Sequence, residues 1–350
     1  MAQRTSPTNI GLWLTAAQVA RDFGYLTTDE FVRRCAATFE TIDRLERHEG
    51  HLLNWYNTKT LAPLPPKYVS TVDSGNLIAS LWVMARGCEE LTETPILKSS
   101  LDGLSDIVAI LGGLAGEDPS IATALNGLRS AARPWVRGIE IVGRLRLAAY
   151  YIEQSLGWKG PSSDARAYWT TKLVTELKAW VAVMDRYMHW MEVPSEMSDQ
   201  ALLALGPSFV QLRRDALRDL PSFAALAGGT PEPLDTLFAK RNTPELRPEW
   251  TIWLDAVHRE YTAARANAIG TVRRLRDLAE RSNRLAGEIN MAVLYDPERR
   301  LFGTGSEQSF GSTDRLWRTH RRGEFPSVPT ARSSRIRSIN IGRLEFLIWP

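Results

Sequence analysis

Helical periodicity is the feature that most limits what this 350-residue chain can fold into. Through most of the first 290 positions, apolar residues recur every three or four residues, as at Phe31, Cys35 and Phe39. Such spacing places apolar side chains on one face of a helix, and a chain of many such helices must bury those faces against one another. The sequence therefore predicts an all-α domain of antiparallel helices, arranged either as an α/α toroid or as a helical solenoid.

Two helix starts near the N-terminus are marked by their capping residues. The run Ser6-Pro7-Thr8 places a cap residue before a proline in the first turn, and we expect this helix to reach about Phe23. Residues 27–30 have the spacing of a capping box, and the helix behind them is expected to continue to Gly50. Helix is expected to resume near Ser74 after a long interruption.

From about residue 95 to residue 290 one helix follows another, with loops rich in proline and glycine between them. The last of these helices is either a single element or two that meet near Gly270. One short β-hairpin is expected near 292–302, with a turn at 296–299. The expected helical segments are 96–115, 119–132, 134–156, 163–191, 198–218, 231–240 and 248–288.

Charge and apolar content exclude several classes of protein. No apolar run approaches the roughly 18 residues of a membrane span, and the N-terminus opens on polar residues without the pattern of a signal peptide. The net charge is +3, and residues 306–350 carry eight arginines against four acidic residues, so the first 305 residues are nearly neutral. A nearly neutral body is not the footprint of a nucleic-acid-binding protein.

The cysteine and histidine content gives no sign of a metal centre or a cofactor. The two cysteines, Cys35 and Cys88, fall within helical patterns and are expected to be buried free thiols, as in a reducing compartment. No cysteine or histidine spacing fits a zinc site, and no phosphate-binding or dinucleotide motif is present. We therefore expect no cofactor.

Residues 54–76, NWYNTKTLAPLPPKYVSTVDSGN, break the helical pattern with prolines, aromatics and small polar residues. Sugar rings have apolar faces and hydroxyl rims, so they favour stacking on an aromatic ring beside amide or carboxylate groups. Trp55 and Tyr56 supply rings next to such groups, and the prolines reduce the entropy lost when the segment becomes ordered. The start of the following helix can also present backbone N–H groups to a ligand.

The same residues fit structural roles equally well. Asp73 or Ser74 fits the cap of the next helix. Trp55 and Tyr56 fit as core residues under a loop, and Asn9 fits as a polar residue in the first turn of the first helix. Spacing alone does not decide between a saccharide site and these roles.

Three phrases resemble a known family when they are taken together: RTSPTNIGLWLTAAQVARDFGYL, LERHEGHLLNWYNTKTLAPLPPKYVSTVDSGNL and LYDPERRLFGTG. They resemble the central glycoamylase-like transglycosylation domain of cyclic β-1,2-glucan synthases, which closes linear β-1,2-glucan into a ring. The resemblance covers roughly residues 4–305 and is strongest at 4–92 and 288–305. It implies an (α/α)6 toroid with a glucan cleft, and a retaining mechanism with two carboxylates about 5–5.5 Å apart.

With this resemblance, the loop residues become expected contacts of β-1,2-glucan, the expected partner. The expected substrate-binding residues are Asn9, Asn54, Trp55, Tyr56, Asp73, Ser74, Asn76 and Asp296.

The resemblance ends at Gly305. In the family the chain continues into a second helical half that carries acidic residues of the active site, whereas residues 306–350 are rich in arginine and serine and lack helical periodicity. We therefore expect an incomplete (α/α)6 toroid over 1–305 and an irregular tail over 306–350 that reads as if translated out of frame. The catalytic carboxylates are expected in the absent half and stay unknown here, with Asp73 the one early acid to test.

We therefore expect this chain to be part of a cyclic β-1,2-glucan synthase and to be a catalytically incomplete fragment of it. Whether the chain is itself an enzyme stays open. The alternative is a non-catalytic helical scaffold that binds saccharide or protein. An incomplete toroid would leave apolar helix faces exposed, through which the chain is expected to associate. A cytoplasmic location is expected, because the family is anchored in the bacterial inner membrane with this region soluble.

Overall fold

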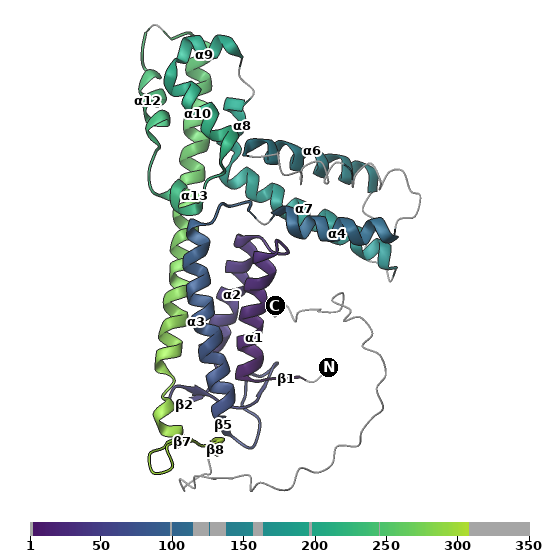
Figure 1. Ribbon diagram of the computed structural model, residues 1–350, viewed down its shortest axis with the longest axis vertical. Helices are drawn as coiled ribbons and strands as arrows, with labels where there is room; N and C mark the ends of the chain where they lie inside the picture. The colour runs from purple at the N-terminus through teal and green to yellow at the C-terminus, as the bar shows by residue number, and fades with distance from the viewer. Residues whose placement is uncertain are drawn as a thin grey trace. The chain divides into compact units, whose positions relative to one another are not determined.

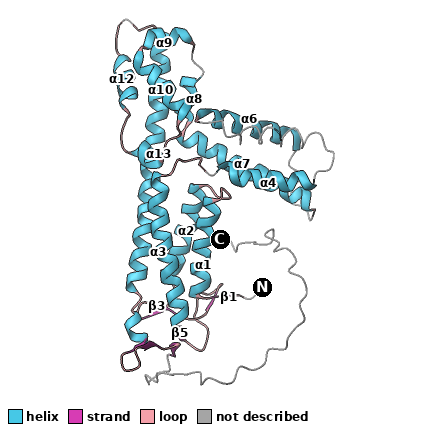
Figure 2. Ribbon diagram, viewed as in Figure 1, coloured by secondary structure: helices cyan, strands magenta, loops and turns pink. Residues whose placement is uncertain are grey.

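The computed structural model describes residues 3–98, 100–114, 126, 138–156, 164–195, 198–244 and 246–307. The chain divides into two units, 1–316 and 317–350, and every described residue belongs to the first. The described part is mostly helical with only short strands, which confirms the all-α expectation (Figures 1 and 2). The expected helix at 119–132 and most of the expected tail lie outside the described residues, and the boundary at 305 stays a prediction.

The helices, in chain order, are α1 (Pro7–Asp22), α2 (Thr28–Ile42), α3 (Thr71–Glu93), α4 (Ser100–Leu114), α6 (Ile139–Leu156), α7 (Ala165–Tyr187), α8 (His189–Ser195), α9 (Asp199–Leu205), α10 (Pro207–Arg218), α11 (Phe223–Ala227), α12 (Glu232–Lys240) and α13 (Pro248–Glu288). A short 3₁₀ helix follows at Met291–Leu294.

The strands form four antiparallel pairs: β1 (Arg4–Thr5) with β4 (Tyr56–Asn57), β2 (Arg47–His48) with β3 (His51–Leu52), β5 (Tyr68–Ser70) with β8 (Gly305–Glu307), and β6 (Tyr295–Asp296) with β7 (Leu301–Phe302).

Local capping explains where the first two helices begin. The Ser6 hydroxyl accepts the backbone N–H of Asn9 at 3.3 Å, and Pro7 occupies the first helical position. Thr27 and Glu30 form the expected capping box, since the Thr27 hydroxyl accepts the Glu30 N–H at 3.2 Å and the Glu30 carboxylate accepts the Thr27 N–H at 3.1 Å. Both predicted starts are therefore confirmed.

Two apolar cores organise the described residues, and α13 contributes to both. The first core joins α1, α2, α3 and the second half of α13, with Leu14, Phe31 and Leu81 fully buried. The second core is formed by α4, by the helices from α6 through α12, and by the first half of α13. Trp180 and Phe209 lie buried within it. In Figure 1, α13 is a single long helix that α3 accompanies over one part of its length. Of the two alternatives that the sequence left open for this segment, α13 is the single helix, which continues through Gly270.

Contacts along the first core fix the directions of its helices. Thr8 lies beside Asp73 and Gly11 beside Ser80, so α1 and α3 run in parallel. Asp29 lies beside Arg274, while Asp43 lies beside Arg281, so α2 and α13 also run in parallel. The short turn between α1 and α2 reverses the chain, which makes the two parallel pairs antiparallel to each other. These four helices, α1, α3, α13 and α2, are called the first bundle below.

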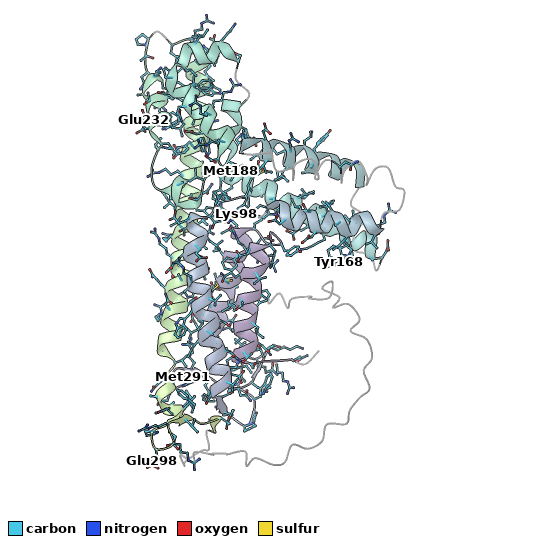
Figure 3. All side chains as sticks on the ribbon, viewed as in Figure 1. Lys98, Tyr168, Met188, Glu232, Met291 and Glu298 are labelled. Carbon is cyan, nitrogen blue, oxygen red and sulfur yellow. The ribbon has the colours of Figure 1, made fainter. Side chains whose placement is uncertain are left out.

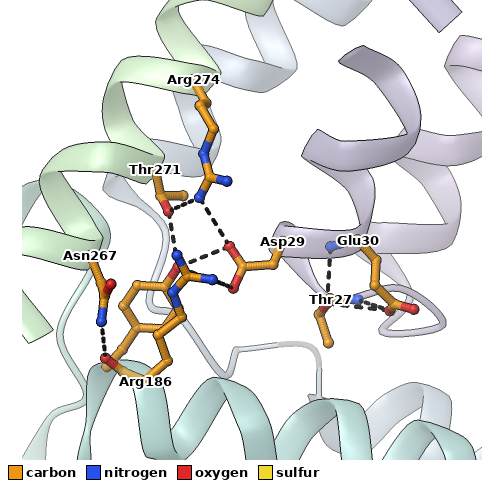
Figure 4. Close-up of polar contacts among 8 residues, drawn as sticks. Thr27, Asp29, Glu30, Arg186, Asn267, Thr271 and Arg274 are labelled. Carbon is orange, nitrogen blue, oxygen red and sulfur yellow. Dashed lines mark hydrogen bonds and ion pairs between the residues drawn. The ribbon is translucent and has the colours of Figure 1, made fainter. Parts of the chain in front are cut away.

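A polar cluster that is buried at Tyr187 and Thr271 and exposed at its two arginines joins α7 to the first bundle (Figure 4). The Tyr187 hydroxyl contacts both oxygens of the Asp29 carboxylate at 2.9 and 3.1 Å and the Thr271 hydroxyl at 2.9 Å. Arg186 and Arg274 approach the same carboxylate at 3.4 and 3.6 Å. Burial raises the pKa of Tyr187, so its hydroxyl stays protonated and can donate to Asp29.

Several predicted boundaries are wrong, and backbone geometry explains them. The second helix ends at Ile42 instead of Gly50, because residues 47–52 form the β2–β3 hairpin, whose turn at Glu49 and Gly50 has φ values of 50° and 80°. Segment 163–191 is broken at Met188, a fully buried residue marked in Figure 3. The expected C-terminal hairpin is present, but it starts at Tyr295, since Met291–Leu294 is 3₁₀ helix.

Among the described helices, none combines the length and the apolar character that a membrane span requires. The described residues also hold no group of three or more His, Cys, Asp or Glu side chains with metal-binding geometry. Cys35 and Cys88 are both fully buried free thiols, as expected.

Candidate functional site

The loop at 54–76 is held by backbone pairing to segments distant in sequence. β4 pairs with β1 at the N-terminus, and β5 pairs with β8 near residue 305. Within the loop, the Asn54 N–H donates to the Tyr68 carbonyl at 2.6 Å and the Leu64 N–H donates to the Trp55 carbonyl at 2.8 Å. The N-terminal and C-terminal phrases that carry the family resemblance therefore meet around this loop.

Tyr56 anchors the loop in the first core. Its side chain is 0% exposed, and its hydroxyl accepts the Leu53 N–H and donates to the Glu46 carbonyl, both at 2.6 Å. Burial raises the pKa of Tyr56 to about 12. Because no face of this ring is open, we assign Tyr56 the core role that the sequence left open and leave it out of the saccharide contacts proposed below.

Trp55, the adjacent residue, is only half-buried. The Arg4 guanidinium lies 4.5 Å from the centroid of its ring, in the range of a cation–π contact. The indole N–H donates to the Asn54 side-chain oxygen at 3.0 Å when that amide is oriented to donate its nitrogen to Asp73. Trp55 is thus a partly exposed plate whose orientation is fixed by two neighbours.

Asp73 joins the starts of α1 and α3. Its carboxylate accepts the Thr8 N–H at 3.3 Å and the Asn54 side-chain nitrogen at 3.2 Å. The Asn76 side chain in turn donates to the Thr8 hydroxyl at 3.1 Å. The cap of α3 is Ser70, whose hydroxyl accepts the Asp73 N–H at 3.2 Å, so neither Asp73 nor Ser74 is the cap.

We call the surface formed by Arg4, Thr8, Asn9, Asn54, Trp55, Asp73 and Asn76 the polar–aromatic cluster. Asn9 is exposed in the first turn of α1, and Asn76 is exposed in the second turn of α3. Since the two helices are parallel, the positive ends of both dipoles lie together under the cluster. The cluster therefore offers one aromatic plate, three amides and a carboxylate near two helix N-termini.

Two expected contact residues have other partners. Ser74 is buried, and its hydroxyl lies 2.8 Å from His51 Nδ1, while His51 Nε2 lies 2.9 Å from the Asn290 carbonyl. That carbonyl only accepts, so Nε2 donates to it and Nδ1 accepts from Ser74; burial also lowers the pKa of His51. Asp296 accepts the N–H groups of Glu298 and Arg299 within its own turn.

Three residues of this region are not among the contacts predicted from the sequence: Arg4, Thr8 and His51. Arg4 and Thr8 contact the cluster only because β1 pairs with β4 and α1 packs beside α3. No local pattern signals either contact. His51 carried a signal as a histidine at the entrance of an aromatic loop, but its ring faces the core instead of the surface.

A separate groove of about 330 Å³ lies between α6 and α7. It contains none of the residues expected from the sequence. Its lining is formed by Arg146, Ala149, Tyr150, Val174, Leu177, Lys178, Val181, Ala182 and Asp185.

Comparison with known proteins relates part of the chain to a synthase of known product. No protein-family model matches the chain. The cyclic β-(1,2)-glucan synthase NdvB of Rhizobium meliloti (strain 1021) is 40% identical to this chain over 142 residues. The aligned part covers 40% of this chain and only 5% of that synthase. This identity supports a relation to the cyclic β-1,2-glucan synthases over part of the chain's length.

Proposed function

We propose, from this relation to cyclic β-1,2-glucan synthases, that the chain takes part in β-1,2-glucan processing and that the polar–aromatic cluster is one wall of its glucan-binding groove. The observation that carries the proposal is the Trp55–Asn54–Asp73 arrangement above the starts of α1 and α3. It joins a partly exposed ring to amides and a carboxylate that are already fixed in place.

The physical basis is the match between this surface and a glucose unit. The apolar face of the sugar packs on the Trp55 ring, either beside Arg4 or after displacing it from the ring. The hydroxyl rim then reaches Asn9, Asn54 and Asn76, whose amides can both donate and accept hydrogen bonds. Because Asn54 and Trp55 already fix each other's orientation, little side-chain entropy is lost when glucan binds.

We further propose that the first bundle is part of an (α/α)6 toroid. In such a toroid, helices of one layer run parallel to one another and antiparallel to the helices of the other layer. The parallel pair α1 and α3, with α2 antiparallel to both, supports this arrangement.

We assign no catalytic carboxylate to the chain. The Asp73 carboxylate already accepts hydrogen bonds from Thr8 and Asn54, which is a structural use of a carboxylate and differs from the free nucleophile of a retaining enzyme. The proposal for this chain is therefore glucan binding without ring formation.

The test is a calorimetric titration of linear β-1,2-glucan into the wild-type chain and into Trp55→Ala. Removing a stacked aromatic ring is expected to weaken binding by about 10- to 100-fold, which corresponds to about 1.4–2.8 kcal/mol. Tyr168→Ala is the matched control, because Tyr168 is 47% exposed on α7 and belongs to neither the cluster nor the first bundle.

Glucan binding that Trp55→Ala leaves unchanged would contradict the proposed site. Wild-type protein that is folded by circular dichroism and binds no β-1,2-glucan would contradict the proposed function. A β-1,4-linked glucan of equal length tests the linkage, and it is expected to bind at least tenfold more weakly than the β-1,2-linked chain.

A further inference from the structure

Helices α1 and α3 are in contact at two glycines, where there is no room for a side chain. A Cβ atom at Gly11 would lie 2.7 Å from the Ser80 hydroxyl oxygen, and one at Gly87 would overlap the Gln18 side chain. These contacts define one side of each helix. The side of α1 that carries Leu14 and Ala17 faces the first core, and so does the side of α3 that carries Leu81.

The remaining side of α1 is apolar and exposed. Leu12, Ala16, Val19 and Phe23 follow one another at spacings of four, three and four residues, so they form a single stripe along the helix. Leu12 is 60% exposed, Val19 45% and Phe23 58%. A solvent-facing stripe on a surface helix is normally polar, so this stripe needs an explanation.

The matching side of α3 has the same character. Val72, Ala79 and Val83 recur at spacings of seven and four, and Trp82 lies next to them. Val72 is 68% exposed, Trp82 61% and Val83 49%. In Figure 1, α1 and α3 lie side by side. Because the two helices are parallel and each stripe lies opposite the side of its helix that packs on the first core, the two stripes point to the same side of the bundle.

We call these two stripes together the α1–α3 apolar face. Its six most exposed side chains offer on the order of 600 Å² of apolar surface, the upper end for the largest patch of a monomer. A standard interface buries about 800 Å² per partner. Once neighbouring residues are included, the face is therefore large enough to be the centre of such an interface.

Charge is distributed unequally along this face. At the C-terminal ends of α1 and α3 lie the exposed acids Asp22, Glu89, Glu90 and Glu93, with Arg86 paired to Glu89 and Glu90. Burial and the nearby Glu90 raise the pKa of Asp22 against the opposing effect of Arg21. At the N-terminal ends lie Arg4 and the positive ends of both helix dipoles. One end of the face is thus negative, while at the other end Arg4 and the helix dipoles offset the single Asp73 carboxylate.

We propose that the α1–α3 apolar face binds a second copy of this chain, packed antiparallel about a two-fold axis. Such an arrangement stacks two parallel helix pairs with opposed dipoles. The acidic end of each copy then lies over the Arg4 end of the other, so the same surface is complementary to itself. The inference does not depend on glucan binding.

The test is the mass of the full chain in solution by sedimentation equilibrium between about 1 and 100 μM. The wild-type chain is expected to be a dimer at the upper end of this range. The double variant Val19→Glu/Val83→Glu is expected to raise the dimer dissociation constant at least 100-fold, because two charges per copy would be buried without partners. Both positions are exposed, so the fold should tolerate the change.

Ile252→Glu is the matched control, since Ile252 is 71% exposed on α13 and lies outside the face. It is expected to leave the dimer intact. A wild-type chain that stays monomeric at 100 μM would overturn the proposal and point to another occupant, including residues 308–350 of the same chain. A dimer that persists unchanged in the double variant would place the interface elsewhere and would also overturn it.

Discussion

Gly50→Ala is expected to lower the free energy of unfolding by about 4 kcal/mol, from two separate causes. Gly50 has a φ of 80°, where a side chain costs about 1–2 kcal/mol. A Cβ atom there would also lie 1.8 Å from the Glu288 carbonyl oxygen and 2.6 Å from its carbon, so the hairpin and the end of α13 must separate. Backbone atoms cannot rotate away as a flexible side chain can.

Urea unfolding followed by circular dichroism measures this change. Gly270→Ala is the control, because Gly270 lies inside α13 and a Cβ atom there has no neighbour within 4 Å. That substitution is expected to be neutral or to stabilise by up to about 1 kcal/mol. If the two variants unfold at the same urea concentration, the hairpin does not pack on α13 in the way described.

Tyr56→Ala is expected to be equally damaging, with a loss of about 4–5 kcal/mol. The substitution leaves a cavity where a fully buried ring stood, and it removes the hydroxyl that links the Leu53 N–H to the Glu46 carbonyl. A loss of this size is a large part of the total stability of an ordinary domain. The loop that carries Trp55 is expected to become disordered in the Tyr56→Ala variant.

Tyr56→Phe separates the two parts of that effect. It keeps the ring and removes only the hydroxyl, so the expected loss is about 1–2 kcal/mol. Because Tyr56 has no open face, the folded Tyr56→Phe protein is expected to bind β-1,2-glucan within twofold of the wild-type chain. Trp55→Ala should show the opposite pattern, with weakened binding and little change in stability. A Tyr56→Phe variant that is fully stable but loses glucan would show that the Tyr56 hydroxyl contacts the ligand, which would contradict its assignment to the core.

The parts of the fold that the sequence predicted are those set by local interactions. Ser6 and the Thr27–Glu30 pair cap their helices through atoms three residues apart, so spacing alone is enough to place both starts. The periodic pattern also predicted helix over 248–288, although it left open a break near Gly270 that α13 does not have. The two buried cysteines lie on core faces as their spacing indicated.

The parts that were missed depend on contacts between distant segments. The β2–β3 hairpin turns at Gly50 against Glu288, which lies 238 positions later in the chain. Nothing near Glu49 in the sequence shows that a helix must stop before it. β1, β4, β5 and β8 are too short to show alternation, and they exist only because the loop meets the N-terminus and the segment near 305.

Trp55 and Tyr56 illustrate the limit for the candidate site. As neighbours in sequence they gave the same signal, and both a core role and a surface role were open to each. Trp55 lies just before β4 and Tyr56 within it, and only one of the two rings is fully buried. The pairing of β4 with β1 decides that this is Tyr56, and that pairing is not visible in composition or spacing.

The most direct test of the central claim is the indole N–H spectrum of the ¹⁵N-labelled chain during a titration with linear β-1,2-glucan. The chain has twelve tryptophans, and Trp55→Phe identifies the Trp55 signal. The Trp55 signal is expected to move with added glucan, because its N–H contacts Asn54 within the proposed groove, while the signal of Trp180, which is buried in the second core, is expected to stay in place. A Trp55 signal that does not move at saturating glucan would contradict it.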